Sequence, residues 1–302
     1  MASAARRPTL SGRISASKRS APQSDLRFHE ALLLGAVQGV TEFLPVSSTG
    51  HLILARLLLR RPPDPDVDLL IDVALHLGTL GALMTTCAHD WRRAAMALLH
   101  LALGRRPDPA DARIAAVLCL ATLPPILVGG RWPRVVQGSG RSPQRVGTAM
   151  AVVGLILGLV DRWAPSHRAA PGPMLGIALG LAQAAALVPG VSRSGATILA
   201  CRLLGLERTT AVRTSFLVAG PVTVAAVAKE LWEARQVRLG RRLLAPLAAG
   251  ILTSCIAGML TNRWLLRYAV HHELWSFALY RLLMGTALVG RAPLGSRAEL
   301  GS

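Results

Sequence analysis

Long apolar stretches with few polar interruptions dominate residues 26–292 of this chain. They lack the regular apolar and polar alternation that marks the strands and amphipathic helices of soluble domains. Several approach the roughly 20 residues that a helix needs to cross a bilayer. The pattern predicts an all-α integral membrane protein, a multi-span bundle of these apolar helices: Leu26–Phe43, Leu69–Cys87, Ala94–Leu103, Ile114–Gly130, Val146–Val160, Met174–Val188, Phe216–Ala228, Leu243–Leu260 and Leu274–Val289.

Composition and charge agree with a membrane protein. Hydrophobic residues make up 52% of the chain and charged residues 17%, and the mean hydropathy is +0.43. Arginine pairs such as Arg92–Arg93 and Arg241–Arg242 flank the apolar stretches, as in membrane loops. The net charge of +18 lies at span ends and in a tail, with only 4% aromatic residues and no nucleic-acid motif. We therefore expect membrane lipids, and no nucleic acid, as partners of the basic residues.

The two ends of the chain are set apart from the predicted bundle. Residues 1–24 hold no acidic residue and are rich in Arg, Ser and Ala, which predicts a disordered basic tail over 1–25. A second disordered tail is predicted over 293–302, so that 26–292 forms a single membrane domain. The four cysteines have no paired spacing and are expected to be small buried hydrophobic residues: Cys87, Cys119, Cys201 and Cys255.

Two short segments, Gly50–Leu59 and Gly195–Leu206, each follow a helix breaker and are too short to cross a membrane alone. Pro45 precedes the first, and Pro189–Gly190 precedes the second. Backbone that leaves the helix at membrane depth must be surrounded by protein or line a cavity. The sequence therefore predicts two re-entrant, broken helix pairs.

A constant offset relates the two breaks. Gly35 and Gly180 lie 145 positions apart (180 − 35), and the same offset relates Gln38 to Gln183. It also places Ser47 on Ser192. Paired interruptions in corresponding halves indicate inverted repeats with a shared site between them. The repeat halves are expected to cover roughly 26–140 and 172–290.

The first break carries a carboxylate and a histidine. Glu42 lies between long apolar runs, where an ionisable group is costly and needs a partner. Gln38 stands four residues earlier, on the same helix face. His51 follows the break and is expected to transfer protons, because histidine titrates near neutral pH. Glu42 and His51 are candidates for proton transfer, and Glu42 also for holding a divalent metal.

Both breaks carry hydroxyl groups at the predicted start of a helix, where free N–H groups and the helix dipole attract anions. Arg193 in the second break adds a permanent charge whose planar fork fits phosphate oxygens. The hydroxyls are expected to bind phosphate, and Ser48 also to attack phosphorus: Ser47, Ser48, Thr49, Ser192, Ser194 and Thr197.

A diphosphate is the anion that best matches a site of this composition. Because the site is expected within the bilayer, we expect the substrate to be a lipid. Two classes of function remain open on these residues. One is an enzyme that acts on the diphosphate, and the other is a transporter or lipid flippase, because inverted repeats with broken helices are common in transporters. The crowding of a carboxylate, hydroxyls and a histidine in one turn favours the enzyme.

These two segments resemble the bacterial undecaprenyl-diphosphate phosphatases, also called bacitracin-resistance proteins. The first motif of that family stands here without a gap from Gln38 to His51, and the second, Pro-Gly-x-Ser-Arg-Ser-Gly-x-Thr, from Pro189 to Thr197. Similarity extends over roughly residues 28–290 and includes Asp72–Leu83.

The resemblance implies an enzyme of the bacterial cytoplasmic membrane that converts undecaprenyl diphosphate to the monophosphate carrier of cell-wall synthesis, with its active site facing outward. It implies catalytic roles for Glu42, Ser48, His51 and Arg193, and a requirement for a divalent cation such as Mg²⁺ or Ca²⁺. Gln38 occupies the family's first acidic position, which removes one potential metal ligand. The sequence leaves open whether a phosphoserine forms or an activated water attacks.

Overall fold

The computed structural model describes residues 26–61, 63–131, 142–166, 172–237 and 239–290. This part of the chain is helical and contains no β-strand, which confirms the predicted fold class. The predicted tails at 1–25 and 293–302 lie outside the described residues. The helices are α1 (Phe28–Thr41), α2 (Ser48–Leu58), α3 (Pro65–Ala102), α4 (Pro109–Arg131), α6 (Pro143–Trp163), α7 (Pro173–Ala185), α8 (Arg193–Leu203), α9 (Arg208–Ala234), α10 (Arg241–His271) and α11 (Trp275–Gly290).

Five of these helices are long and apolar enough to cross a membrane: α3, α4, α6, α9 and α10. The prediction of two separate spans at Leu69–Cys87 and Ala94–Leu103 was wrong, since both belong to the 38-residue α3. The pair Arg92–Arg93 does not break this helix. Arg93 forms an ion pair with Asp111 of α4 at 2.5 Å, and at 1.5 Å per residue α3 extends well beyond the hydrocarbon core.

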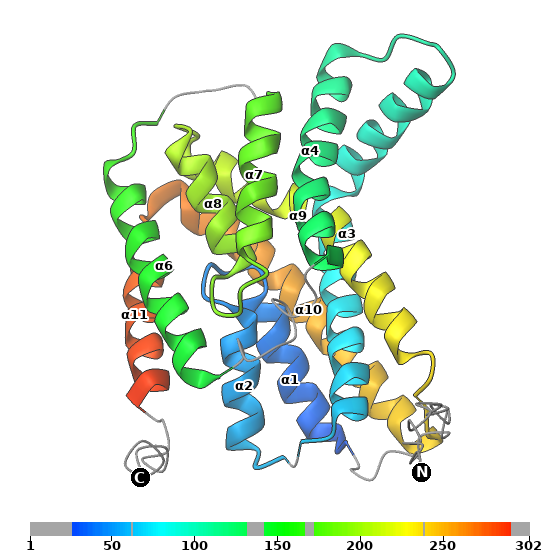
Figure 1. Ribbon diagram of the computed structural model, residues 1–302, viewed down its shortest axis with the longest axis vertical. Coiled ribbons are helices and arrows are strands. Elements are labelled where there is room, and N and C mark those ends of the chain that lie inside the picture. Colours follow the sequence, from blue (N-terminus) through cyan, green and yellow to red (C-terminus); the bar gives the residue numbers. More distant parts are fainter. Residues whose placement is uncertain (1–25, 62, 132–141, 167–171, 238, 291–302) are drawn as a thin grey trace, which may run out of the picture.

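Two helical hairpins enter the molecule from opposite ends (Figure 1). One consists of α1 and α2, the other of α7 and α8, and their turns meet near the middle of the bundle. The second helix of each hairpin begins two residues earlier than the sequence pattern predicts, at Ser48 and at Arg193. These hairpins are the two broken helix pairs expected from the sequence.

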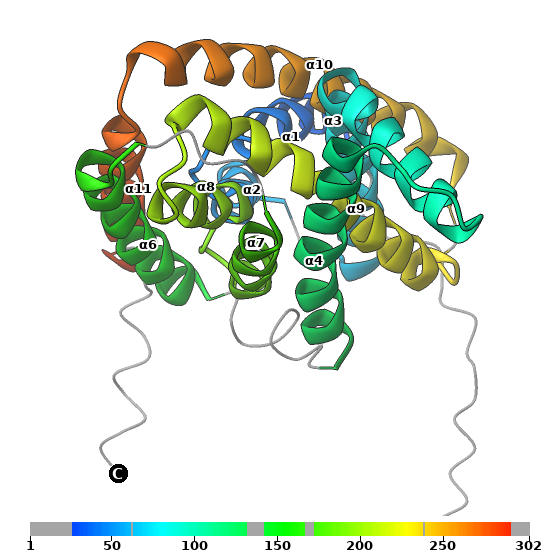
Figure 2. The same cartoon turned by 90° about the horizontal axis from the view of Figure 1, so that it is seen from above.

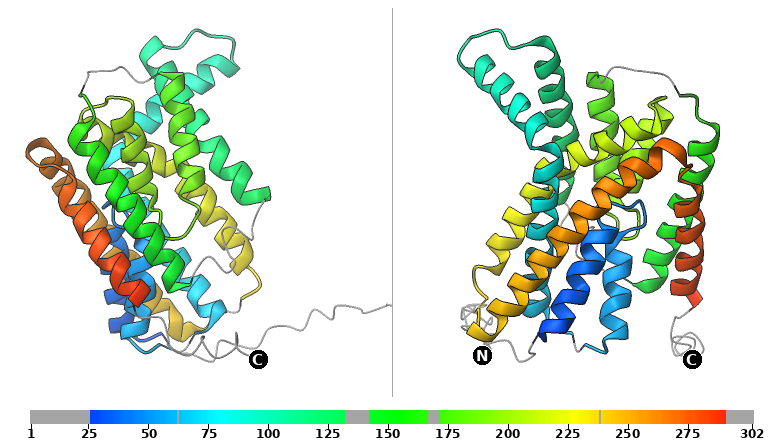
Figure 3. Two further views of the ribbon diagram at one scale, coloured as in Figure 1. Left: turned by 60° about the vertical axis from the view of Figure 1, so that its left-hand side comes forward. Right: turned by 180° about the vertical axis from the view of Figure 1, so that it is seen from behind.

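Each hairpin packs on a helix from the opposite half of the chain. α1 lies against α10, which crosses the molecule diagonally, and α7 lies against α4 (Figure 3). Gly35 and Gly180, the glycines related by the offset of 145, make these contacts possible. A Cβ atom on Gly35 would lie 2.7 Å from the carbonyl oxygen of Gly250, and one on Gly180 2.6 Å from that of Leu120. Small residues at such positions allow helix backbones to approach closely in membranes.

The remaining pair, α6 and α11, stands side by side at one end of the bundle, away from α3 and α9 (Figure 2). Gly147 and Gly285 face each other in this pair, and a Cβ atom on either would lie within 2.5 Å of the other's carbonyl oxygen. Among the described helices, α6 follows α1 to α4 along the chain and α11 follows α7 to α10.

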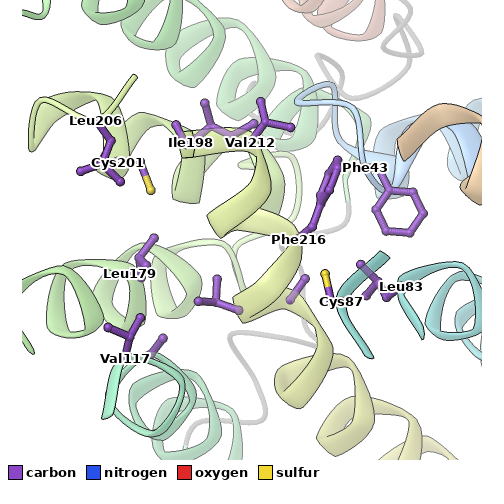
Figure 4. Close-up of a cluster of buried hydrophobic side chains, with 14 of the residues drawn as sticks. Phe43, Leu83, Cys87, Val117, Leu179, Ile198, Cys201, Leu206, Val212 and Phe216 are labelled. Carbon is purple, nitrogen blue, oxygen red and sulfur yellow. The ribbon is translucent and has the colours of Figure 1, made fainter. Parts of the chain in front are cut away.

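The largest apolar cluster lies beside the first turn. Phe43, the residue after Glu42, meets Phe216 of α9 edge to face with ring centroids 5.6 Å apart (Figure 4). Cys87 and Cys201 are buried in this cluster, as predicted. Cys119 is exposed on α4, contrary to the prediction, because this face of the helix lies on the outside of the bundle, where the membrane replaces protein as the apolar surrounding.

Candidate active site

The backbones of the two turns have the same unusual conformation. Ser47 precedes α2 with φ 74° and ψ 97°, and Ser192 precedes α8 with φ 72° and ψ 115°. Residues other than glycine seldom have positive φ, and such strain of about 1–3 kcal/mol persists where surrounding contacts impose it. The sharp turns that Pro45 and Pro189–Gly190 predict thus place two helix N-termini beside each other.

A single buried arginine from α11 binds both turns. The Arg281 side chain is fully buried, and its guanidinium donates hydrogen bonds to the carbonyl oxygens of Pro45 at 3.0 Å and Val191 at 2.9 Å. It also donates to the carbonyls of Gly190 and Met150, each at 3.0 Å. Carbonyl groups from both halves of the chain therefore converge on one cation.

Glu42 and Arg193 join the two turns directly. Nη2 of Arg193 donates to Oε1 of Glu42 at 2.7 Å, although the residues are 151 positions apart. Nη1 of Arg193 donates to the hydroxyl of Thr223 at 2.5 Å and to the carbonyl of Ala219 at 3.1 Å. The guanidinium is thus fixed from α9 with one edge against the carboxylate. The partner that a carboxylate at this depth requires is Arg193.

The second oxygen of Glu42 accepts two further hydrogen bonds. The Ser48 hydroxyl donates to Oε2 at 2.7 Å, and Nε2 of Gln38 donates to the same atom at 3.1 Å. Gln38 fixes the carboxylate from the preceding helical turn. A hydroxyl that donates to a fixed carboxylate has the arrangement of a nucleophile and its base.

These groups surround a cavity of about 180 Å³ between the two hairpins. Of the predicted catalytic residues, Glu42, Ser48 and Arg193 line it. Of the predicted phosphate-binding residues, Ser47, Thr49 and Ser192 line it as well. With the N-termini of α2 and α8 at its wall, the cavity is positive on one side and carries hydroxyl donors, as a phosphate site requires.

Ser194 and Thr197 were also predicted to bind phosphate, but they do not line the cavity. The Ser194 hydroxyl donates to the carbonyl of Leu44 at 2.8 Å. The Thr197 hydroxyl lies 2.6 Å from that of Ser215 and bonds the carbonyl of Arg193. Both are buried, and their contacts hold the start of α8 against the first turn and α9.

The structure does not bring His51 to this cavity. Its Nδ1 lies 2.7 Å from the carbonyl oxygen of Ser47, and its Nε2 lies 2.6 Å from the Tyr280 hydroxyl. A carbonyl only accepts, so Nδ1 carries the hydrogen and Nε2 accepts from Tyr280. His51 instead lines a second, largely apolar pocket of about 410 Å³ with residues of α10 and α11.

Sequence reasoning missed the histidine that does line the cavity. His76 on α3 faces it, and its Nδ1 lies 3.1 Å from Oε2 of Glu230 on α9. Thr223, the partner of Arg193, was missed as well. The signal for His76 was available, since it is a polar residue inside a long apolar helix, within the segment Asp72–Leu83 that resembles the family.

The described residues contain no group of three or more His, Cys, Asp or Glu side chains placed to hold a metal. Glu42 is the carboxylate among the described lining residues. The buried amide oxygen of Gln38 has no hydrogen-bonding partner. Mg²⁺ is commonly held by one or two carboxylates together with substrate phosphates. The site therefore fits a cation that arrives with a phosphorylated ligand.

The fold and the cavity define a polytopic membrane protein with a polar cavity between two re-entrant hairpins. Residues 31–287 match the family model described as bacitracin resistance protein BacA. The chain is 40% identical over 262 residues to the undecaprenyl-diphosphatase of Rubrobacter xylanophilus, covering 86% of this chain and 96% of that protein. It is 39% identical over 270 residues to the enzyme of the same name from Gemmatimonas aurantiaca, covering 89% and 98%. The chain belongs to the bacitracin-resistance protein family.

Proposed function

We propose that this protein hydrolyses undecaprenyl diphosphate to undecaprenyl phosphate and inorganic phosphate. The relatives described above carry the name of that activity. The observation in the structure that carries the proposal is the Glu42 carboxylate, which binds the Ser48 hydroxyl with one oxygen and the Arg193 guanidinium with the other. A base, a nucleophile and a phosphate-binding cation thus meet at two helix N-termini.

In this proposal Arg193 and the N-termini of α2 and α8 bind the diphosphate and stabilise the charge that develops on the terminal phosphoryl group. The Ser48 oxygen attacks the terminal phosphorus, and its proton passes to Glu42. The bond between that phosphorus and the bridging oxygen breaks, and the lipid monophosphate leaves. Water then releases phosphate from Ser48, and the proton on Glu42 returns to the serine oxygen.

We also propose that a divalent cation, Mg²⁺ or Ca²⁺, binds with the substrate. Glu42 lines the cavity and would hold the cation, and the buried amide oxygen of Gln38, which has no hydrogen-bonding partner, supports this assignment. The cation supplies additional charge stabilisation to the diphosphate. We expect that chelation of divalent cations stops phosphate release and that added Mg²⁺ restores it.

The proposed setting is the bacterial cytoplasmic membrane, with the cavity open to the outer side. There the enzyme recycles the lipid carrier for cell-wall synthesis and confers bacitracin resistance. Phosphate release from added substrate should be faster with right-side-out than with inverted membrane vesicles. Faster phosphate release with inverted vesicles contradicts the proposed orientation.

The decisive experiment measures phosphate release by the purified protein in detergent from a prenyl diphosphate. We expect turnover by the wild type and a loss of about 10³-fold or more in Glu42→Gln, which removes the base and the partner of Arg193 but keeps the shape. Glu233→Gln, on the outer surface of α9, is the matched control and should be unaffected. A wild-type protein that binds the diphosphate without cleaving it contradicts the phosphatase and supports a flippase or transporter.

A further inference from the structure

We propose that His76, held by Glu230, accepts the proton of the water that attacks phosphorus during hydrolysis. The inference deepens the proposed phosphatase activity and rests on it. It assigns the proton transfer to His76 of α3, which lines the cavity, and to Glu230 of α9, which binds the His76 ring.

The geometry of the pair fixes the tautomer of the neutral imidazole. Glu230 accepts at 3.1 Å from His76 Nδ1, so the hydrogen of the neutral ring lies on Nδ1 and the lone pair on Nε2. Among the described residues Nε2 has no hydrogen-bonding partner, and the imidazole is 27% exposed. His76 is one of the residues that line the cavity. Nε2 is therefore available to a molecule bound there.

The other candidate bases are already occupied. Glu42 binds Arg193 through Oε1, and Ser48 together with Gln38 through Oε2. Glu42 therefore acts as the proton acceptor for Ser48. His51 uses both ring nitrogens in contacts outside the cavity. In the proposed mechanism Glu42 still holds the serine proton when water attacks, so the water proton needs another acceptor, and His76 is the group that we assign to it.

The proton and electron balance of this step closes without a further reactant. The water oxygen forms a bond to phosphorus, and one water proton moves to Nε2 of His76. The bond between phosphorus and the Ser48 oxygen breaks, and that oxygen takes back the proton held by Glu42. Phosphate leaves, and the imidazolium, paired with Glu230, releases its proton to solvent.

The charged groups around His76 are compatible with this role. Glu230 faces it from α9, and Asp72 lies one turn earlier on α3, where it pairs with Arg56 at 2.6 Å. Glu42 and Arg193 face it across the cavity as an ion pair. Two of these three carboxylates are paired with a guanidinium, and Glu230 is the carboxylate that binds the ring and stabilises the imidazolium after proton transfer.

The test compares His76→Ala and His76→Gln with the wild type in phosphate release from a prenyl diphosphate, with and without added imidazole. Both variants should lower kcat by about 10²-fold with little change in KM. Imidazole should raise the turnover of His76→Ala by about tenfold or more, since the deleted ring leaves room for it, and should not raise that of His76→Gln. Glu230→Gln should lower kcat, leave KM unchanged and show no rescue by imidazole.

His89→Gln is the matched control, because His89 lies on the same helix beside a carboxylate but is 71% exposed and outside the cavity. Turnover of both His76 variants within about twofold of the wild type contradicts the inference. So does a loss that imidazole does not relieve in His76→Ala, since that loss reflects structure alone. In either case the proposed function stands if the wild type still releases phosphate, and it fails separately if the wild type does not.

Discussion

The two turns at the centre of the molecule share a backbone but differ in chemistry. Each places a serine of positive φ before a short helix, and the first residue of that helix contacts Glu42 at 2.7 Å. In the first turn that residue is Ser48, which brings a hydroxyl. In the equivalent position of the second turn it is Arg193, which brings a permanent charge. Neither turn alone holds both the proposed nucleophile and the proposed phosphate-binding cation.

The comparison shows how an internal repeat produces an asymmetric site. The repeated backbone supplies two helix N-termini that face one another, and so doubles the preference for an anion. The residues at two equivalent positions then differ: Ser48 supplies the proposed attacking group, and Arg193 supplies the charge. The common element is Arg281, which binds carbonyls of both turns from α11. The predictions below separate what the turns share from what each contributes.

The largest effect is expected for Arg281→Lys, which acts on both turns. An ammonium cannot reach the four carbonyl groups that the guanidinium binds, and a buried acceptor left unsatisfied costs about 1–3 kcal/mol. We expect a loss of at least about 3 kcal/mol in the free energy of unfolding, together with loss of turnover. Denaturation of the purified variant in detergent measures the loss in the free energy of unfolding. Arg263→Lys, exposed on the neighbouring α10, is the control, and equal stability of the two variants contradicts the role of Arg281.

Arg193→Lys tests the second turn alone. Charge is kept, but the fork that binds Glu42 and Thr223 at once is lost, and phosphate oxygens meet a point charge. Turnover should fall by about 10²-fold, while the melting temperature changes little. Kinetics on a prenyl diphosphate measure this effect, with Arg213→Lys as the control because Arg213 is 67% exposed and pairs with Asp90. If the Arg193→Lys variant keeps full turnover and an Arg193→Ala variant loses it, charge alone matters at this position.

The sequence predicted the membrane bundle, the two broken helix pairs and the need of Glu42 for a partner. Those features follow from apolar length, helix breakers and the cost of a buried carboxylate. The length of α3 was missed because an arginine pair that meets an acidic partner on another helix looks like the end of a span. Such a partner is visible only in three dimensions.

The differences between the expected and the observed placement of side chains in the site have a related cause. Proximity in sequence placed His51 beside Glu42, but His51 lies one helical turn past the strained serine and its ring bonds Tyr280 of α11. His76 comes from a helix whose apolar pattern predicts only a span. Ser194 and Thr197 lie in the motif, yet their side chains point to neighbouring backbone groups and not to the cavity. A motif identifies the turn but not the direction of each side chain.

The smallest effect, and the finest test of the comparison, is expected when each strained serine is replaced by glycine. Glycine adopts positive φ without penalty, so Ser47→Gly should stabilise the protein by about 0.5–1 kcal/mol, because Ser47 makes no side-chain cap bond. Ser192→Gly should gain little, since the Ser192 hydroxyl accepts from the backbone N–H of Gly195 at 3.2 Å and that bond is lost. Denaturation of both variants in detergent measures the difference. Ser47→Ala and Ser192→Ala are the controls, because alanine keeps the strain and removes only the hydroxyl: the first should be nearly neutral and the second destabilised by about 1 kcal/mol. Equal stabilisation by the two glycines would mean that the cap on α8 contributes nothing and that the turns differ only in the side chains they present to the cavity.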